Sequence, residues 1–219
     1  MDSLINDIYQ RQKDLLKAFK FYEKSALIIG AGGIGSWIAL NLALIGVGTL
    51  IIIDPDTVEH SNLNRTLFRL SDIGRNKAEV IKELISERRS DVITISVKKY
   101  FSIDHLKVYN VDYIFDCTDT LSVRNKFKSL DFIGEYVKVG YDGFYASISI
   151  NDFESGSWGE DGSYTTVPSF FGTPQVISAL VITEILINNK FEVKTINFTT
   201  DKILEGLVQI QDADQQTEQ

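Results

Sequence analysis

A chain of 219 residues, 44% of them hydrophobic, carries enough apolar side chains to bury a core and does not have a disordered composition. Its net charge of −8 argues against general nucleic-acid binding, and its single cysteine excludes an intramolecular disulfide or a four-thiolate zinc site. The N-terminus lacks a signal pattern, and no apolar run reaches about 20 residues. We therefore expect a cytoplasmic protein without a membrane span.

Residues 3–20 space their apolar side chains as a helix does, which predicts a helical arm within residues 1–24. Arg11 lies on this arm. Most arginines on such a helix are solvated, so the residues alone give Arg11 no function.

The stretch from Ser25 to Arg65 organises the chain. An apolar run, Ala26–Ile29, leads into a glycine turn at Gly30–Gly35, and a second apolar run, Leu50–Ile53, ends in Asp54. This spacing predicts a strand, a phosphate-binding turn, a helix and a second strand with an acid at its tip. The glycines let backbone amides approach phosphate, the helix N-terminus favours an anion, and a carboxylate can bind ribose hydroxyls. The pattern favours an adenine nucleotide site over an ordinary tight turn.

The segment that follows Asp54 is rich in Asp, Ser and Asn, which predicts a loop over the carboxyl edge of the sheet, where ligands bind. Asn62 can donate and accept hydrogen bonds, and Arg65 can bind phosphate with two donors. Stabilisation of the loop accounts for both residues equally well. Lys77 lies in the first turn of the next helix, where the dipole disfavours a cation, so its side chain reaches either a phosphate or solvent.

A third apolar strand, Tyr113–Phe115, runs into Asp116-Cys117-Thr118-Asp119. Asp119 therefore falls at another strand-to-helix junction on the same edge as Asp54. A carboxylate at this position is either a magnesium ligand or the N-cap of the following helix. Cys117 has no evident base beside it, which favours a packed side chain over a nucleophile.

The remaining periodic segments are strands at Val92–Val97, Tyr136–Tyr141 and Ala146–Ile150, helices at Ile103–Val108, Leu121–Leu130 and Gly172–Asn188, and a terminal hairpin of Val193–Thr199 and Ile203–Ile210. Residues 151–170 have the length and composition of a substrate loop, with Trp158, Tyr164 and Phe170 either contacting substrate or packing the flap. The polar tail 211–219 is expected to be disordered. The predicted fold is α/β: one domain over residues 1–210, with a Rossmann-like, mostly parallel sheet flanked by helices, an N-terminal helix and a C-terminal antiparallel extension.

Five motifs, in this order, closely resemble the ThiF/MoeB/HesA family, which includes the adenylation domains of ubiquitin-activating enzymes. They are Gly30–Ser36, Asp54–Val58, Ser61–Arg65, Asp72–Lys77 and Cys117–Asp119, within a resemblance that covers residues 8–190. The S-N-L-N-R motif is far more specific than the glycine turn, because dehydrogenases lack it.

The resemblance implies a homodimer that binds ATP and magnesium and adenylates a carboxylate, often the C-terminus of a ubiquitin-like or sulfur-carrier protein or a peptide. The residues that it places around the nucleotide are Gly30, Gly32, Gly33, Gly35, Asp54, Asp56, Asn62, Arg65, Lys77 and Asp119. Asp54 would hold the ribose and Asp119 would bind magnesium. Asn62, Arg65 and Lys77 would bind the phosphates.

Arg11 gains a role from the same resemblance. The family carries an R-Y-x-R-Q element on its N-terminal helix, and its second arginine reaches the ATP of the partner subunit. This chain has Ile8-Tyr9-Gln10-Arg11-Gln12, in which the second arginine is present and the first is replaced. The candidate catalytic residues are therefore Arg11, supplied in trans, with Arg65, Lys77 and Asp119.

The chain also departs from the family. It has no C-x-x-C pairs, so no zinc is expected, and residues 134–219 contain no cysteine that could form a thioester. Thr120 stands where the family usually has Asn, and the loop before Lys77 is one residue shorter. These departures leave the residues for adenylation intact. The sequence does not identify the acceptor of the acyl group.

Three other interpretations compete with activation of a protein C-terminus. A tRNA-modifying dehydratase of the same superfamily activates a nucleoside carboxylate, which the acidic charge counts mildly against. A nicotinamide-dependent oxidoreductase conflicts with S-N-L-N-R and Lys77. A non-catalytic ATP-binding partner protein would keep the nucleotide residues without turnover.

Overall fold

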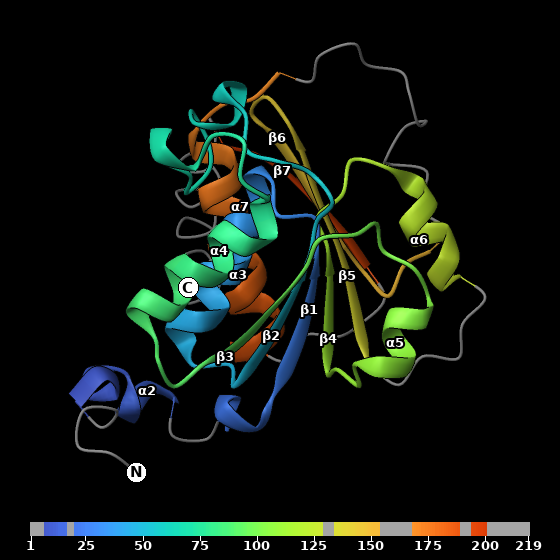
Figure 1. Ribbon diagram of the computed structural model, residues 1–219. Helices are drawn as coiled ribbons and strands as arrows, with labels where there is room; N and C mark the ends of the chain where they lie inside the picture. Colours follow the sequence, from blue (N-terminus) through green and yellow to red (C-terminus); the bar gives the residue numbers. More distant parts are fainter. Residues whose placement is uncertain (1–6, 17–19, 129–133, 154–167, 189–193, 201–219) are drawn as a thin grey trace, which may run out of the picture.

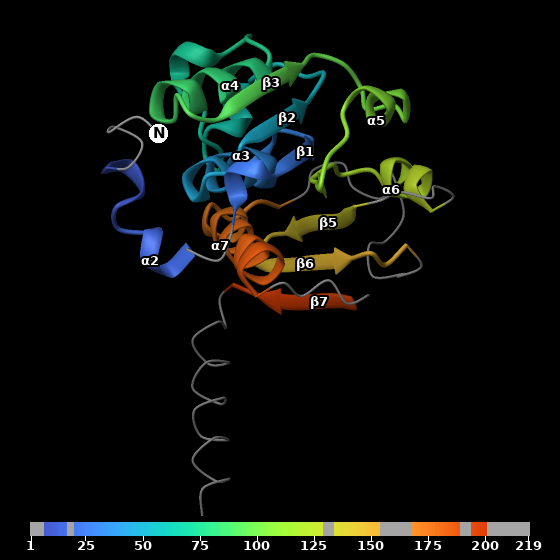
Figure 2. The same cartoon turned by 90° about the horizontal axis from the view of Figure 1, so that it is seen from below.

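The computed structural model describes residues 7–16, 20–128, 134–153, 168–188 and 194–200 (Figure 1). These residues form a seven-stranded sheet in the order β3-β2-β1-β4-β5-β6-β7, which Figure 2 shows from one end. The strands are β1 (Ser25–Ile29), β2 (Thr49–Ile53), β3 (Ile93–Val97), β4 (Tyr113–Asp116), β5 (Glu135–Asp142), β6 (Tyr145–Ile150) and β7 (Lys194–Thr199). Neighbouring strands from β3 to β5 pair in parallel, whereas β6 and β7 add in antiparallel fashion. The predicted Rossmann-like α/β fold with an antiparallel extension is confirmed.

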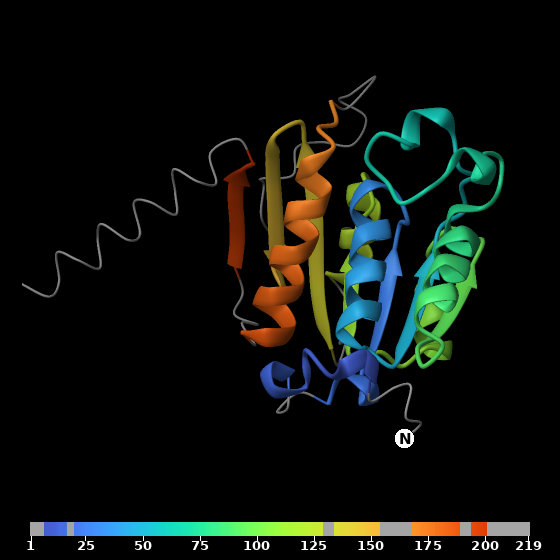
Figure 3. The same cartoon turned by 90° about the vertical axis from the view of Figure 1, so that its left-hand side faces the viewer.

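Helices cover both faces of this sheet. The first face carries α3 (Gly33–Ile45), α4 (Lys77–Arg88) and α7 (Gly172–Ile182), which lie side by side in Figure 3. The second carries the shorter α5 (Asp104–Val108) and α6 (Leu121–Phe127). Side chains of β1 alternate between the two cores, with Ile28 in the first and Leu27 in the second. Because both faces are buried, the central strands are continuous apolar runs in the sequence.

The register brings three strand ends into one row at the carboxyl edge. Ile29, the last residue of β1, pairs with Ile53 of β2 on one side and with Asp116 of β4 on the other. The strand order reverses between β1 and β4, and the turns after these strands flank the crevice in which open α/β sheets bind ligands. The fold therefore places the glycine turn, Asp54 and the 116–119 turn at one edge.

The N-terminal arm differs from the continuous helix predicted over residues 3–20. Residues 7–9 are helical, residues 10–12 form a turn, and α2 (Lys13–Leu16) follows. The Tyr9 hydroxyl donates to Asp91 at 3.0 Å and accepts from Arg89, whose guanidinium lies 4.7 Å from the Tyr9 ring centroid. Arg89 also donates to the carbonyls of Ala43 and Leu44, in the last turn of α3. These hydrogen bonds hold Tyr9 against the end of α3. The segment then turns at residues 10–12 and does not continue as one helix, as its apolar spacing predicts.

Most other boundaries agree with the sequence. The helix predicted at 172–188 is α7 followed by a π-helical segment, Thr183–Ile187, and the first strand of the terminal hairpin is β7, paired with β6. Phe170 packs against Phe144 and Phe171, with ring centroids 4.8 and 4.7 Å away. The predictions for residues 154–167, with Trp158 and Tyr164, and for residues 203–219 lie outside the described residues. Among the helices described, none is long and apolar enough to cross a membrane.

Candidate functional site

The glycine turn joins β1 to α3 through a close approach of two backbones. Gly30 has φ +88°, a left-handed conformation that favours glycine, and its amide donates to the Ile53 carbonyl at 2.8 Å. A Cβ at Gly35 would lie 1.8 Å from the Gly30 carbonyl oxygen, so only glycine lets the first turn of α3 pack there. A Cβ at Gly32, in contrast, would meet no heavy atom within 4 Å. Free space beside the amides of a helix N-terminus suits an anionic group.

Asp54 ties the tip of β2 to this turn. Its side chain is 4% exposed, with Oδ2 accepting from the Ala31 amide at 2.6 Å and Oδ1 from the Asp56 amide at 2.8 Å. Burial raises the pKa of Asp54, and the two amides and the charge of Lys77 offset part of that rise. Each carboxylate oxygen has a second acceptor position, which the hydroxyls of a ribose could fill. The sequence pattern did not indicate the Ala31 contact.

The base of the 54–76 loop is closed by hydrogen bonds around Lys77, the first residue of α4. The Lys77 amide donates to the Asp56 carbonyl at 2.9 Å, and its ammonium lies 3.1 Å from an Asp56 carboxylate oxygen. Asn76 donates to the carbonyls of Asp54 and Asp56 and caps α4 by accepting from the Glu79 amide. Lys77 is thus held by a carboxylate that is itself largely exposed. Asparagine directly before a helix is a common N-cap, a signal that sequence reasoning missed here.

Asn62 and Arg65 are both folded onto their own loop. The Asn62 side-chain oxygen accepts from the Glu59 amide at 3.0 Å, and Nη1 of Arg65 donates to the Ser61 carbonyl. Trp37, in the second turn of α3, donates from its indole to the Arg65 carbonyl at 3.0 Å, which brings this segment to the helix that follows the glycine turn. Loop stabilisation is therefore a visible role of both residues. If Asn62 and Arg65 also contacted a phosphate, they would do so in addition to stabilising the loop.

A buried polar network underlies the turn after β4. Asp116 is fully buried and accepts from the Tyr136 hydroxyl at 2.6 Å and from the Thr118 hydroxyl at 2.7 Å. Lys138, 2% exposed on β5, lies 3.4 Å from Asp116 and donates to the Thr118 carbonyl. This network fixes the backbone that leads to Asp119. A lysine inside the apolar run 136–141 predicts a buried partner of opposite charge, because a buried ammonium is costly without one.

Asp119 lies at the exposed end of that turn. The N-cap of α6 is Thr120 and makes no side-chain capping bond, so the prediction that Asp119 caps this helix is not supported. No group of three metal-binding side chains occurs in the described part of the chain. A magnesium ion at Asp119 would accordingly take most of its ligands from phosphate and water, as this ion commonly does.

Cys117 packs against the glycine turn. Its carbonyl oxygen would lie 3.1 Å from a Cβ at Gly30, and its own Cβ 3.4 Å from one at Gly35. Burial raises the pKa of the Cys117 thiol, which keeps the group protonated. The geometry agrees with the prediction of a packed residue.

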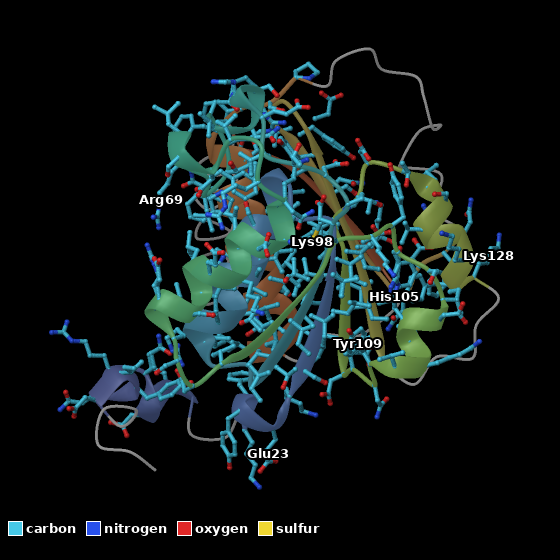
Figure 4. The ribbon with its side chains drawn as sticks, viewed as in Figure 1. Glu23, Arg69, Lys98, His105, Tyr109 and Lys128 are labelled. Atoms are coloured by element: carbon cyan, nitrogen blue, oxygen red, sulfur yellow. The ribbon has the colours of Figure 1, made fainter. Side chains whose placement is uncertain are left out.

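Arg11 does not join the other predicted site residues within one chain. It is exposed and lies two positions after Tyr9, which is bound at the C-terminal end of α3. The glycine turn is at the other end of that helix, whose 13 residues span about 20 Å. In Figure 4, Glu23, just before β1, lies at the bottom of the view, and Arg69 of the 54–76 loop lies well above it. Within this chain, Arg11 therefore lies away from the edge that carries the glycine turn.

Comparison with known proteins identifies the family. The model of the ThiF family matches residues 9–133, more than half of the chain. The chain belongs to the ThiF family. The match spans all five motifs of the resemblance, from the glycine turn to Asp119.

Two relatives show what this family contains. The sulfur carrier protein ThiS adenylyltransferase of Escherichia coli K12 is 37% identical over 110 residues, which are 49% of this chain and 44% of that protein. A tRNA threonylcarbamoyladenosine dehydratase of Bacillus subtilis is 33% identical over 101 residues, 44% of this chain and 40% of that protein. The match therefore spans less than half the length of either relative.

The fold is shared with a protein of known structure. E. coli MccB, crystallised with selenomethionine MccA, superposes with a TM-score of 0.73 at 24% identity, covering 90% of this chain and 69% of that chain. At this identity the likeness concerns the fold alone. It extends beyond residue 133, where the family match ends.

Proposed function

We propose that this chain is an ATP- and magnesium-dependent adenylyltransferase that activates a carboxylate as an acyl adenylate and releases pyrophosphate. The observation that carries the proposal is the hydrogen bond from the Ala31 amide to Asp54, which joins the glycine turn to the acid at the tip of β2, beside the point where the strand order reverses. In the proposal the turn binds phosphate and Asp54 binds the ribose. The relative named as a ThiS adenylyltransferase supports the same chemistry.

The residue types suit that reaction. As a substrate carboxylate attacks the α-phosphorus of ATP, negative charge builds on phosphate oxygens, and positioned cations lower the barrier. Arg65 and Lys77 would supply such cations by exchanging the Ser61 carbonyl and the Asp56 carboxylate for phosphate. Asp119 would hold magnesium. No general base is needed, because the substrate carboxylate is already ionised at neutral pH.

The substrate class proposed is the C-terminus of a ubiquitin-like or sulfur-carrier protein or of a peptide. The name of the E. coli relative specifies a sulfur carrier protein. Activation of a nucleoside carboxylate, as in a tRNA-modifying dehydratase, is the second candidate and is favoured by the B. subtilis match. Pyrophosphate exchange with each substrate class would separate the two.

We also propose a homodimer in which Arg11 completes the partner's site. An apolar groove of about 320 Å³ lies between the N-terminal arm, α3 and α7. Its lining residues are Gln12, Leu15, Asn41, Leu44, Ile45, Ala179, Ile182 and Ile187. Leu15 is 79% exposed, and a second copy would cover it.

Calorimetric titration of the protein with ATP plus magnesium, beside a titration with NADH, tests the nucleotide assignment. We expect ATP to bind, and Arg65→Ala to weaken binding by about 100-fold, as expected for loss of one charged contact to a phosphate. Arg69→Ala is the matched control, because Arg69 lies in the same loop and its side chain forms an exposed ion pair with Glu87 at 3.6 Å. Binding of NADH without ATP would overturn the assignment.

Mixing of inactive variants tests whether Arg11 acts in trans. Arg11→Ala and Asp119→Ala homodimers should both be inactive, whereas each mixed dimer should contain one site with an intact Asp119 and an intact Arg11 from its partner. Recovery of pyrophosphate exchange, measured on tag-purified mixed dimers, is the expected result. If verified mixed dimers stay inactive, Arg11 does not work across the interface.

A further inference from the structure

The hydroxyl of Tyr141 stands over the first residue of α3. Tyr141 lies on β5 near its carboxyl end, and its partly buried ring packs against the core beneath α3 and α7. A Cβ at Gly33 would lie 2.8 Å from the Tyr141 oxygen, closer than such atoms come in folded proteins. Because Gly33 has no side chain, the Tyr141 hydroxyl can lie next to the N-terminus of α3.

This hydroxyl has a partner that an anion could replace. It donates to the Ser169 hydroxyl at 3.2 Å, longer than the usual 2.7–2.8 Å of such bonds. A bond to an ionised phosphate oxygen is shorter and roughly twice as strong as a bond between neutral groups. The hydroxyl would thus gain by exchanging Ser169 for a phosphate.

We propose that Tyr141 is a further nucleotide-contacting residue, whose hydroxyl leaves Ser169 and donates to a phosphate oxygen of ATP at the N-terminus of α3. The inference rests on the proposed adenylyltransferase function. Three observations carry it: the approach to Gly33, the open space at Gly32 beside it, and the long bond to Ser169. The exchange would connect nucleotide binding to the segment before α7, because Ser169 lies just before that helix and forms an isolated β-bridge with Gly143.

Two matched variants separate the hydroxyl from the packing of the ring. Tyr141→Phe keeps the ring and should raise the dissociation constant for ATP with magnesium by about 10- to 100-fold, the range for a hydrogen bond to a charged group. Ser169→Ala removes the resting partner of the Tyr141 hydroxyl and should leave ATP binding unchanged or tighter. Calorimetry measures both variants, and thermal unfolding checks that each remains folded.

The outcomes distinguish this inference from the function on which it rests. Wild-type protein that does not bind ATP would remove the proposed function. Wild-type binding with equal or tighter binding by Tyr141→Phe would leave the function standing and overturn the role of Tyr141.

A second arm tests the geometry without nucleotide. Gly33→Ala should lower the melting temperature, because its methyl group would lie 2.8 Å from the Tyr141 oxygen and the phenol would have to shift away from its place in the core. In a Tyr141→Phe background the nearest ring carbons would lie 3.4 Å away, and the loss of stability should largely disappear. An equal loss in both backgrounds would show that the hydroxyl does not occupy this position.

Discussion

Asp119→Ala is expected to abolish magnesium-dependent turnover while leaving the fold intact. Its side chain is exposed and lies outside the buried network around Asp116, so its loss removes no described packing. Without this carboxylate, a magnesium ion that neutralises charge on the phosphate oxygens would lose the protein ligand proposed for it. Loss of one such electrostatic contact costs about 100-fold or more in rate.

The measurement is pyrophosphate exchange as a function of magnesium concentration, with small carrier proteins and peptides as carboxylate donors. Titration of ATP with and without magnesium provides a second readout, since the variant should lose the magnesium-dependent gain in affinity. Asn125→Ala is the control, because Asn125 is an exposed residue of the adjacent helix. Wild-type turnover by Asp119→Ala would remove the metal assignment.

Lys138→Met is expected to lower the free energy of unfolding by about 3–5 kcal/mol, because it removes the ammonium that lies 3.4 Å from the buried Asp116 carboxylate. Removal of one partner of a buried ion pair is costly since water cannot replace it. Against a total stability of about 5–15 kcal/mol for a domain, this loss is large. Urea denaturation monitored by circular dichroism measures it.

Lys98→Met is the matched control. Lys98 is labelled in Figure 4 and lies 2.6 Å from Glu79, but the side chains of that pair are 53% and 38% exposed. Removal of an exposed pair should cost about 0–1 kcal/mol. Lys138→Met combined with Asp116→Asn should recover part of the loss, because the uncompensated charge disappears. Equal effects of the two lysine substitutions would contradict this account of the buried pair.

Local patterns carried much of the fold prediction. The runs at Ala26–Ile29 and Leu50–Ile53 became central strands because parallel strands are buried on both faces and need continuous apolar sequence. The glycine turn followed from residue type and spacing, since few other sequences allow both a positive φ at Gly30 and the contact at Gly35. The motifs also sufficed to place the chain in the ThiF family.

Contacts between distant residues could not be predicted in the same way. The arm is interrupted by a turn at residues 10–12, although its own periodicity predicts one helix, and Tyr9 beside the turn bonds to the distant Arg89. Lys77 gave no sign that Asp56 would be its partner, because two residues 21 positions apart meet only when the loop closes. Chain-local propensities contain no information on such pairs.

The family, the α/β class and the order of the main elements could be predicted from the sequence, as could the set of candidate nucleotide residues. The three-dimensional fold was needed to find that Asp54 accepts a hydrogen bond from the amide of Ala31, that Lys138 pairs with Asp116, and that Tyr141 faces Gly33. The physical reason is that apolar periodicity and glycine spacing act over a few neighbouring residues. Hydrogen bonds and ion pairs at the sheet edge depend instead on which strand ends the completed sheet brings together.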